Sequence, residues 1–514
     1  HQIIDLRWHD PAGKIPQEPS LARDKHRAIR HSIALLRKRH QALEAGIVCF
    51  HDHCIRIPVL RWKARKVTQP GRRVFGDDRQ RPNSLLWSAM LEKPARPSVG
   101  GNLWRDEFRA TLALAWPLIL SNLTMALIQA TDVVLMGWLG PHELAASALG
   151  LNLCMSMTIF CMGLVIAAAP MMAADLGRRF NAVREVRRWF RQSVWVACVA
   201  VVPAWAVLWN TDAVLFALGQ DAALAETAGT FMSGYMWSML PFLIFQSLRG
   251  FVSALERPGW IFAISVGGVA LNALLGWALI FGHFGLPALG ILGGGVTTTI
   301  VWWIMAIGLG LVAVRHKAFR RFHIFGHFWR SDWPRFGRIT RLGLPIALTL
   351  WSEGAVFAAA VGLMGLISEA SVAAHAVALQ LAALSFMVPL GLGQAATVRV
   401  GLGYGRKDPE ALRRAGWTAF MLGTGFMTCM AILMWTFPHQ LIELFLAPTA
   451  ANAPVIDLAV SFLAVAAAFQ IFDGAQVVVA GMLRGLQDTR WPMMFAILGY
   501  WVVGIGAGSF FAFR

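Results

Sequence analysis

The chain has 514 residues, of which 57% are hydrophobic and 14% are charged, and its formal net charge is +18. A soluble domain carries about 25% charged residues, so this composition excludes an ordinary soluble enzyme, a disordered chain and a coiled coil. It favours a polytopic helical membrane protein. The six cysteines include no CxxC pair and provide no disulfide framework.

The first hundred residues differ sharply from the rest, because they hold 20 Lys and Arg against 9 Asp and Glu and no long apolar run. We expect 1–103 to be a basic segment outside the membrane. One interpretation is a native extension at a membrane surface or nucleic acid. The other, which we favour, is upstream sequence before a start at Met90, so that no nucleic-acid partner is expected. The cluster 51–54 (His-Asp-His-Cys) could bind a metal, but it lacks a second ligand pair.

Eleven apolar runs are long enough to cross a bilayer, which takes about 20 residues for about 30 Å of hydrocarbon. Because a bilayer offers no water to unpaired amides, and the runs are too long for barrel strands, we predict helices. The predicted spans are 112–138, 147–172, 193–210, 228–251, 260–282, 289–314, 342–367, 373–397, 415–437, 455–482 and 492–513.

Charge in the loops predicts the orientation of these spans. The loops after spans 2, 6 and 8 are rich in arginine, whereas those after spans 1, 3, 5, 7 and 9 contain no Lys or Arg. Positive loops stay in the cytoplasm, so the N-terminus and the end of every even-numbered span are expected there. This favours a multi-pass protein of the bacterial inner membrane.

The sequence contains an internal repeat. A shift of 228 residues aligns 114–178 with 342–406 without a gap and gives 19 identities in 65 positions. Six spans separate the copies, so both halves insert the same way up, and substrate sites tend to lie between such repeats. We therefore predict an all-α fold of two pseudo-symmetric six-helix lobes, at 104–314 and 342–514, joined by a basic linker at 315–341. The second lobe shows five spans, so a twelfth helix is expected beyond this chain.

Three acidic residues lie inside predicted spans: Asp132, Glu353 and Asp473. Charged groups are costly in the membrane and usually mark ion or substrate paths. Arg249, Arg399 and Arg484 are expected to reach water from the span ends, which leaves the acids without a basic partner. Such carboxylates can bind a proton, Na⁺ or an organic cation in competition, whereas the structural alternative is a protonated carboxyl bonded to a neighbouring helix.

Other polar groups are weaker candidates. Gln129, Asn272, Gln470 and Gln476 could support the acids, although polar residues also join helices by hydrogen bonds. Pro117 and Pro345 could bend spans 1 and 7. The acids do not match across the repeat, since Asp132 aligns with Ala360 and Glu353 with Met125.

Several short motifs, taken in order, resemble the multidrug and toxic compound extrusion (MATE) family, and its NorM-type bacterial branch most closely. They are Thr131-Asp132 with Gly137-Trp138-Leu139-Gly140, Pro345 with Glu353, Ala373-Ala374-His375, and Phe472-Asp473 with Leu483-Arg484-Gly485. The resemblance covers 104–514. It implies an exporter that opens outward and inward in turn, with Asp132 as the N-lobe acid and Asn272 beside it. Glu353 and Asp473 would form the C-lobe cation site, which could hold Na⁺. A second family asparagine appears here as Gly276.

We therefore expect a monomeric, H⁺- or Na⁺-coupled antiporter for lipophilic cations, with no cofactor and no enzymatic activity. The nearest alternative is a two-lobed flippase for lipid-linked saccharides, which would need basic residues in its cavity. A remote alternative is an intramembrane enzyme, for which HExxH and GxGD motifs are absent.

Overall fold

In the computed structural model, the described residues are the backbone of 47–50 and 53–56, together with 102–179, 182–447, 449, 452–507 and 509–510. Contacts divide the chain into two units, residues 1–94 and 95–514. In the first, β1 (Ile47–Phe50) and β2 (His53–Arg56) pair antiparallel, with Cys49 opposite Cys54. The side chains of the 51–54 cluster lie outside the described residues.

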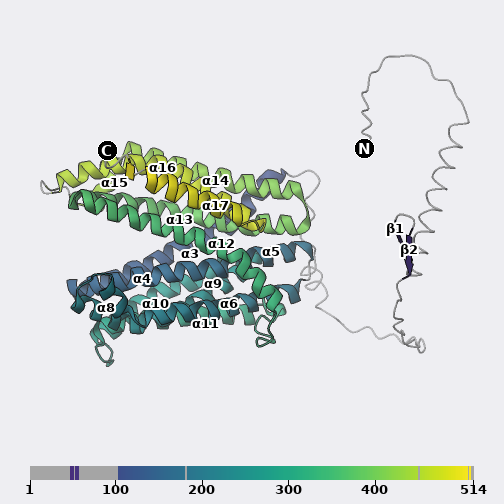
Figure 1. The fold of residues 1–514 in the computed structure, drawn as a ribbon, viewed down its shortest axis with the longest axis horizontal. Coiled ribbons are helices and arrows are strands. Elements are labelled where there is room, and N and C mark those ends of the chain that lie inside the picture. The colour runs from purple at the N-terminus through teal and green to yellow at the C-terminus, as the bar shows by residue number, and fades with distance from the viewer. Residues whose placement is uncertain are drawn as a thin grey trace, which may run out of the picture. The chain divides into compact units, whose positions relative to one another are not determined.

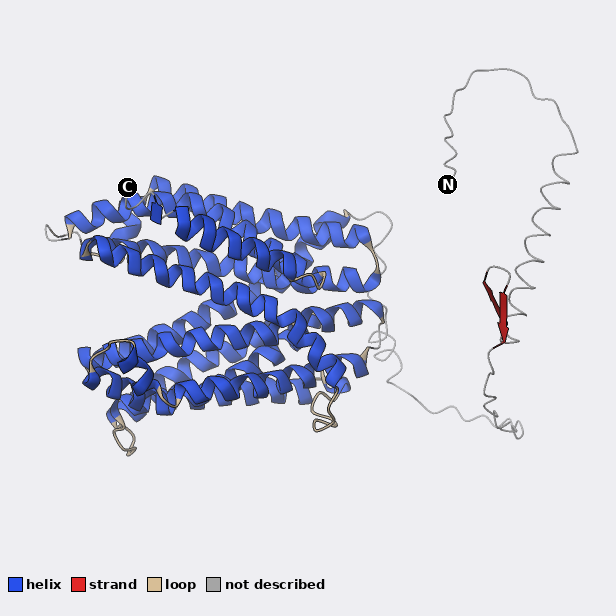
Figure 2. Ribbon diagram, viewed as in Figure 1, coloured by secondary structure: helices blue, strands red, loops and turns tan. Residues whose placement is uncertain are grey.

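The second unit is helical (Figures 1 and 2). The elements of its first half run in chain order from α3 to α11. They are α3 (Leu103–Leu139), α4 (Pro141–Ile166), α5 (Ala168–Arg178), α6 (Val183–Leu208), α7 (Thr211–Ala217), α8 (Ala222–Tyr235), η1 (Met236–Ser238), α9 (Met239–Ala254), α10 (Gly259–Phe281) and α11 (Gly290–Arg315).

The second half follows a loop that contains the short turn η2 (Arg320–Phe322). Its elements are α12 (Trp333–Ile367), α13 (Glu369–Arg406), α14 (Pro409–Thr436), α15 (Pro438–Glu443), α16 (Ala453–Gly485), α17 (Arg490–Ile497) and the π-helical η3 (Leu498–Ala507). The first turns of α12 occupy part of the predicted linker, because hydropathy marks only the apolar portion of a helix.

Nine helical segments in the described part of the chain are apolar and long enough to cross a membrane, with α4 and α5 counted together. The other two predicted spans consist of shorter pieces. The span predicted at 228–251 is interrupted by η1, where the indole of Trp205 donates to the Met236 carbonyl and Thr299 donates to the Gly234 carbonyl. Pro241 also removes one backbone donor just after this turn. Of the span predicted at 492–513, residues 492–507 lie in α17 and η3.

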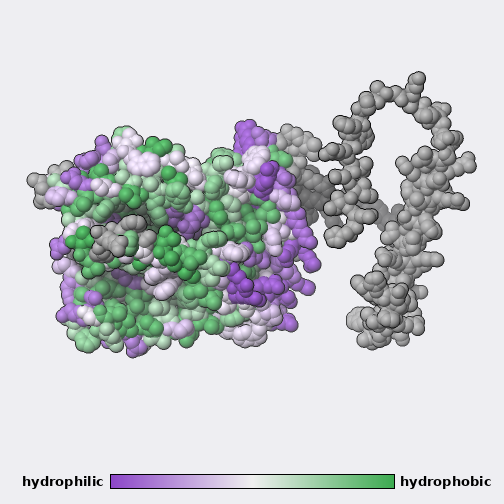
Figure 3. All heavy atoms as spheres, turned by 45° about the horizontal axis from the view of Figure 1, so that its top comes forward, coloured by the Kyte–Doolittle hydropathy of each residue, from purple (hydrophilic) through white to green (hydrophobic). Residues whose placement is uncertain are grey.

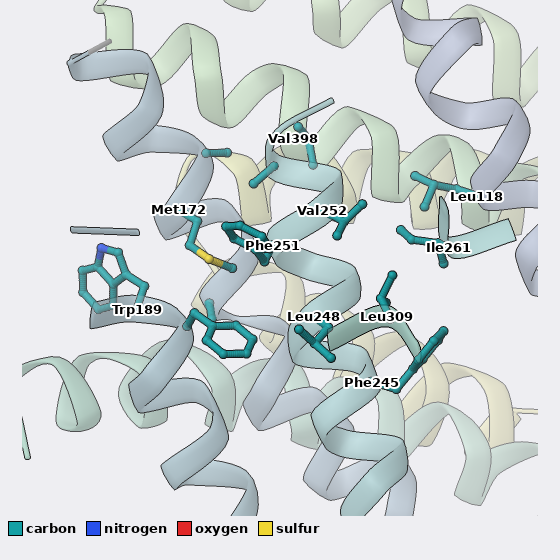
Figure 4. Packing of buried hydrophobic residues seen from close by; sticks show 14 of the residues in the cluster. Leu118, Met172, Trp189, Phe245, Leu248, Phe251, Val252, Ile261, Leu309 and Val398 are labelled. Atoms are coloured by element: carbon teal, nitrogen blue, oxygen red, sulfur yellow. The ribbon is translucent and has the colours of Figure 1, made fainter. Parts of the chain in front are cut away.

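The buried apolar residues form one cluster that joins the two halves and others that lie within a single half. The shared cluster brings Val398 of α13 together with Leu118, Met172 and Phe251 of the first half (Figure 4). The opposite ends have separate cores, one around Met232 and Leu208 and one on α13 to α16. The two lobes are therefore packed together at the end where α5 meets α13.

The internal repeat reappears as reciprocal contacts between the lobes. Gly163 of α4 lies against the backbone of Ala347 on α12, and the repeat-equivalent Gly391 of α13 lies against the equivalent Ile119 on α3. Gly177 and Gly405 are themselves equivalent and face each other, so that a Cβ on either would overlap backbone of the opposite lobe. The pseudo-twofold axis thus passes between Gly177 and Gly405. The parallel-repeat architecture is confirmed.

Hydrophilic residues gather at this same end of the helical unit, while hydrophobic residues cover most of the visible face between the ends (Figure 3). Arg399 of α13 also crosses between the lobes there. It donates to both carboxylate oxygens of Glu107 on α3 at 2.9 and 2.7 Å, and to Glu256 after α9. We call this end of the helical unit, where α5 meets α13, the basic end. It corresponds to the side that the loop charges predict to be cytoplasmic.

We predict that Gly405→Ala destabilises the protein because its methyl group has no space at the lobe contact, where overpacking typically costs about 1–3 kcal/mol. Gly425→Ala in α14 is the matched control, since a Cβ there meets no atom within 4 Å. Thermal unfolding in detergent should show a lower melting temperature for Gly405→Ala alone. Equal melting temperatures for the two variants would contradict the close contact.

Candidate substrate cavity and ion-coupling sites

A cavity of about 390 Å³ lies between the two lobes. Most of its lining is apolar, with methionines and aromatic rings such as Met155, Phe242 and Trp302. Polar side chains interrupt this lining, among them Asn122, Gln129, Asp132, Tyr235, Arg249, Gln394 and Arg484. An apolar chamber with a few polar groups is typical of a site for small molecules.

Asp132 is held on the N-lobe wall of this cavity by two neighbouring helices. Asn272 of α10 donates from Nδ2 to Asp132 Oδ1 at 2.7 Å, and Thr298 of α11 donates from Oγ1 to Oδ2 at 3.1 Å. No basic side chain lies within ion-pair distance of Asp132 among the described residues. The carboxylate is therefore oriented by neutral donors and keeps its lone pairs available to a cation from the cavity.

Glu353 and Asp473 form a second acidic group in the C-lobe, on α12 and α16. Their charges influence each other, and Arg484 and Tyr500 lie close enough to interact electrostatically with Glu353. Gln476 donates a hydrogen bond to the Tyr500 hydroxyl. Neither acid lines the central cavity. The structure thus separates the three predicted acids into one on the cavity wall and a pair inside the C-lobe.

The expected positions of two arginines are wrong. Arg249 and Arg484 do not extend to water at the span ends but line the central cavity. Arg249 is 7% exposed and donates from Nη2 to Asn122 Oδ1 at 2.5 Å and to Gln394 Oε1 at 2.7 Å. It thereby joins α9 to α3 and, across the lobes, to α13. The predicted position of Arg249 along its helix is correct. The sequence alone does not reveal that the other lobe covers that end of the helix.

The repeat explains the different partners of these arginines. Arg484 interacts with Glu353, whereas Arg249 lies beside Met125, the residue that aligns with Glu353 in the first copy. Arg249 therefore uses amide oxygens in place of a carboxylate. Glu353 consequently has a basic neighbour, which corrects the expectation that all three acids lack one.

The supporting residues predicted from sequence lie in different places. Gln129 lines the cavity, and Asn272 contacts Asp132 directly. Gln470 instead exchanges hydrogen bonds with Ser385 of α13 and is 2% exposed, so in this structure it joins two helices of the C-lobe. Pro117 and Pro345 lie inside α3 and α12 without ending them.

Thr298, Tyr235 and Tyr500 were missed at the sequence level. Thr298 supplies the second donor to Asp132, on the helix after that of Asn272. Gly276, where the family has an asparagine, packs against Leu135 and contributes no polar group. A hydroxyl in an apolar helix is common, so only the fold could indicate which one meets the acid. No cluster of three or more His, Cys, Asp or Glu side chains that could hold a metal occurs within the part of the chain that the structure describes.

The sequence matches the MatE family over residues 117–278 and 345–508, which are the two repeats. The chain belongs to the MATE family. It is 53% identical over 414 residues to the probable multidrug resistance protein NorM of Mesorhizobium japonicum, a match that covers 80% of this chain and 89% of that protein. It is 49% identical to the protein of the same name from Brucella suis, over 80% of this chain and 88% of that one.

Solved structures of MATE transporters share the fold. The eukaryotic transporter AtDTX14 superposes with a TM-score of 0.71 at 21% identity, covering 80% of this chain and 90% of that one. A multidrug resistance MATE transporter of the MOP superfamily, described in an outward-facing conformation, also gives 0.71, at 18% identity over 79% and 88% of the two chains. The protein is thus a multi-pass membrane transporter, and the predicted two-lobed fold is confirmed.

We predict that Asn272→Leu lowers the free energy of unfolding by about 1–3 kcal/mol, because it removes a donor to a buried charged group. Asn152→Leu is the control, since Asn152 is exposed and its amide makes no hydrogen bond in the described residues. Chemical or thermal unfolding in detergent provides the measurement. A loss no larger than that of Asn152→Leu would show that the Asp132 contact contributes nothing.

Proposed function

We propose that this MATE protein is a cation-coupled multidrug antiporter of the bacterial inner membrane. In this proposal it exports lipophilic organic cations in exchange for H⁺ or Na⁺ and works as a monomer. The observation that carries the proposal is Asp132, a carboxylate on the wall of a largely apolar cavity whose hydrogen-bond partners are both neutral. The names of its relatives from Mesorhizobium and Brucella support multidrug resistance as the physiological role.

Competition for carboxylate oxygens provides the exchange. An organic cation that enters the cavity would lie against Asp132 and the surrounding methionine and aromatic side chains, which adapt to flat apolar molecules. When a proton or Na⁺ takes the carboxylate, the electrostatic attraction for the drug is lost and the drug leaves. Since the carboxylate carries only one charge, the two positive species exclude each other there.

The unequal packing of the lobes supports alternating access. They share a core at the basic end and have separate cores at the other end, so we assign this structure to an outward-open state with its N-terminus in the cytoplasm. To open inward, the lobes would separate at Gly177, Gly405 and the Arg399 ion pairs and come together at the opposite end. Drug would then bind from the cytoplasm or the inner leaflet.

The Glu353 and Asp473 pair is proposed as the second coupling site, in the C-lobe. Two neighbouring carboxylates repel each other when both are ionised, so a bound proton or Na⁺ relieves the repulsion.

The number of protons exchanged for each drug molecule sets the driving force for export. One proton exchanged for one monovalent drug moves no net charge and gains about 1.4 kcal/mol per pH unit. A second proton would add about 2.3 kcal/mol per 100 mV of membrane potential.

A flippase for lipid-linked saccharides is the second candidate, and the two arginines in the cavity favour it. Arg249 and Arg484 could contact a diphosphate, the group that such a substrate carries. We rank it lower because Arg249 is already bonded to Asn122 and Gln394, and Arg484 interacts with Glu353. The two candidates differ in the charge of the transported molecule.

We predict that Asp132→Asn reduces ethidium uptake into inverted proteoliposomes by at least about tenfold, because a neutral amide cannot exchange one cation for another. Glu353→Gln and Asp473→Asn should each weaken the dependence of uptake on the imposed H⁺ or Na⁺ gradient. Fluorescence of ethidium bound to enclosed DNA reports the transport.

Asp457→Asn is the matched control, because Asp457 is an exposed acid on the same helix as Asp473. It should transport like the parent. If Asp132→Asn, Glu353→Gln and Asp473→Asn all transport ethidium like the parent under both the H⁺ and the Na⁺ gradient, the assignment of the acids to ion coupling is wrong. Transport of an anionic lipid-linked saccharide without transport of ethidium would favour the flippase.

A further inference from the structure

A separate basic pocket lies at the basic end of the protein, away from the central cavity. Its volume is about 750 Å³, and it is formed by the start of α6, the loop before α12 and the first residues of α12. Five arginines line it: Arg184, Arg187, Arg188, Arg191 and Arg330. None of them lines the transport cavity.

Hydrogen bonds between α6 and the loop hold this pocket in shape. Arg187 donates from Nε to the Phe322 carbonyl at 2.9 Å, and Arg191 donates from Nη1 to the His327 carbonyl at 2.9 Å. The indole of Trp195 donates to the Phe328 carbonyl at 3.2 Å. These bonds fix the loop on the helix and place the arginines around one space.

Arg191 is buried in the wall of this pocket. The residue is only 4% exposed, and its Nε atom is buried without a hydrogen-bond partner among the described residues. A buried guanidinium donor without an acceptor is unfavourable. An anion in the pocket would lie beside this guanidinium, whose Nη1 is already held by the His327 carbonyl.

The charge in the pocket is unbalanced. Asp332 is the single carboxylate in its described lining, and it already forms an ion pair with Arg335 at 3.5 Å. The charges that act on Arg191 are the carboxylate of Asp332 and the guanidinium groups of Arg188, Arg330 and Arg335. The adjoining pocket is different, since its arginines are accompanied by Asp175 and Glu185 as well as Asp332. The excess of positive charge is therefore larger in this pocket, with five arginines to one carboxylate, than in the adjoining pocket, with five arginines to three carboxylates.

The surroundings favour a lipid over a soluble anion. Trp333 lines the pocket and is 69% exposed, and Trp329 in the same loop is 85% exposed. Exposed tryptophan is typical of the boundary between membrane and water. Both α6 and α12 are helices apolar enough to span the membrane. A molecule that enters this pocket can therefore have a charged head between the arginines and apolar chains beside the tryptophans.

We propose that this pocket binds the phosphate headgroup of an anionic phospholipid, with the two phosphates of cardiolipin as the best match for five arginines. Arginine binds phosphate oxygens in bidentate fashion, and basic pockets between membrane helices suit such headgroups. The proposal depends on the membrane location of the protein and not on the transport function proposed above.

Native mass spectrometry of the detergent-solubilised protein tests this directly. The probes are cardiolipin, phosphatidylcholine and soluble glycerol 3-phosphate, each added separately. Cardiolipin should bind at least about tenfold more tightly than phosphatidylcholine, and glycerol 3-phosphate should not bind at comparable concentrations. The double variant Arg188→Gln/Arg330→Gln should lose roughly tenfold or more in cardiolipin affinity. These two residues are exposed and hold no loop carbonyl, so the fold should persist.

The matched control is Arg320→Gln/Arg406→Gln, which removes the same charge from exposed positions at the same end. It should bind cardiolipin like the parent. An equal loss in both double variants would overturn the proposal in favour of general attraction by the basic surface. Equal binding of phosphatidylcholine would overturn it, and tight binding of glycerol 3-phosphate would replace the lipid by a soluble phosphate.

Discussion

Close contacts between glycines and the backbone of the opposite lobe, across the pseudo-twofold axis, hold the two lobes together. Gly163, Gly177, Gly391 and Gly405 let helices of opposite lobes approach until a single methyl group would overlap. In a membrane the surrounding lipid is as apolar as the helices, so association depends on such packing rather than on hydrophobic burial. Contact of this kind is strong only at short range. It can therefore be lost completely when the lobes rotate, which suits a two-state transporter.

The two copies of the repeat share this packing but differ in their acidic residues. Gly177 and Gly405 match across the copies, whereas Asp132 matches Ala360 and Glu353 matches Met125. Asp132 consequently lies among neutral donors on the cavity wall, and Glu353 lies near Arg484 and Asp473 inside the C-lobe. Two sites with different surroundings can respond to different cations or at different steps of one cycle.

Much of the architecture could be predicted from the sequence, because the bilayer imposes helix length and the repeat imposes symmetry. The acids were found because ionisable residues are rare in apolar runs. The position of Arg249 could not be found in this way. Its place near a helix end predicted access to water, and only the arrangement of two lobes shows that Gln394 covers it. Thr298 was missed for a similar reason, since its contact with Asp132 spans 166 positions of the chain.

Paired distance measurements by electron spin resonance test the rocking of the lobes most directly. The labels would be attached to cysteines introduced into a variant that lacks the six native cysteines. One pair would be placed at Leu218 and Leu444, which are exposed at the ends of the two lobes remote from the basic loops. A second pair would be placed at Arg257 and Arg406, which are exposed at the basic end. A change in pH or Na⁺ should shorten the first distance and lengthen the second together. If both distances stay unchanged while the protein transports ethidium, or both change in the same direction, the lobes do not open at one end while they close at the other.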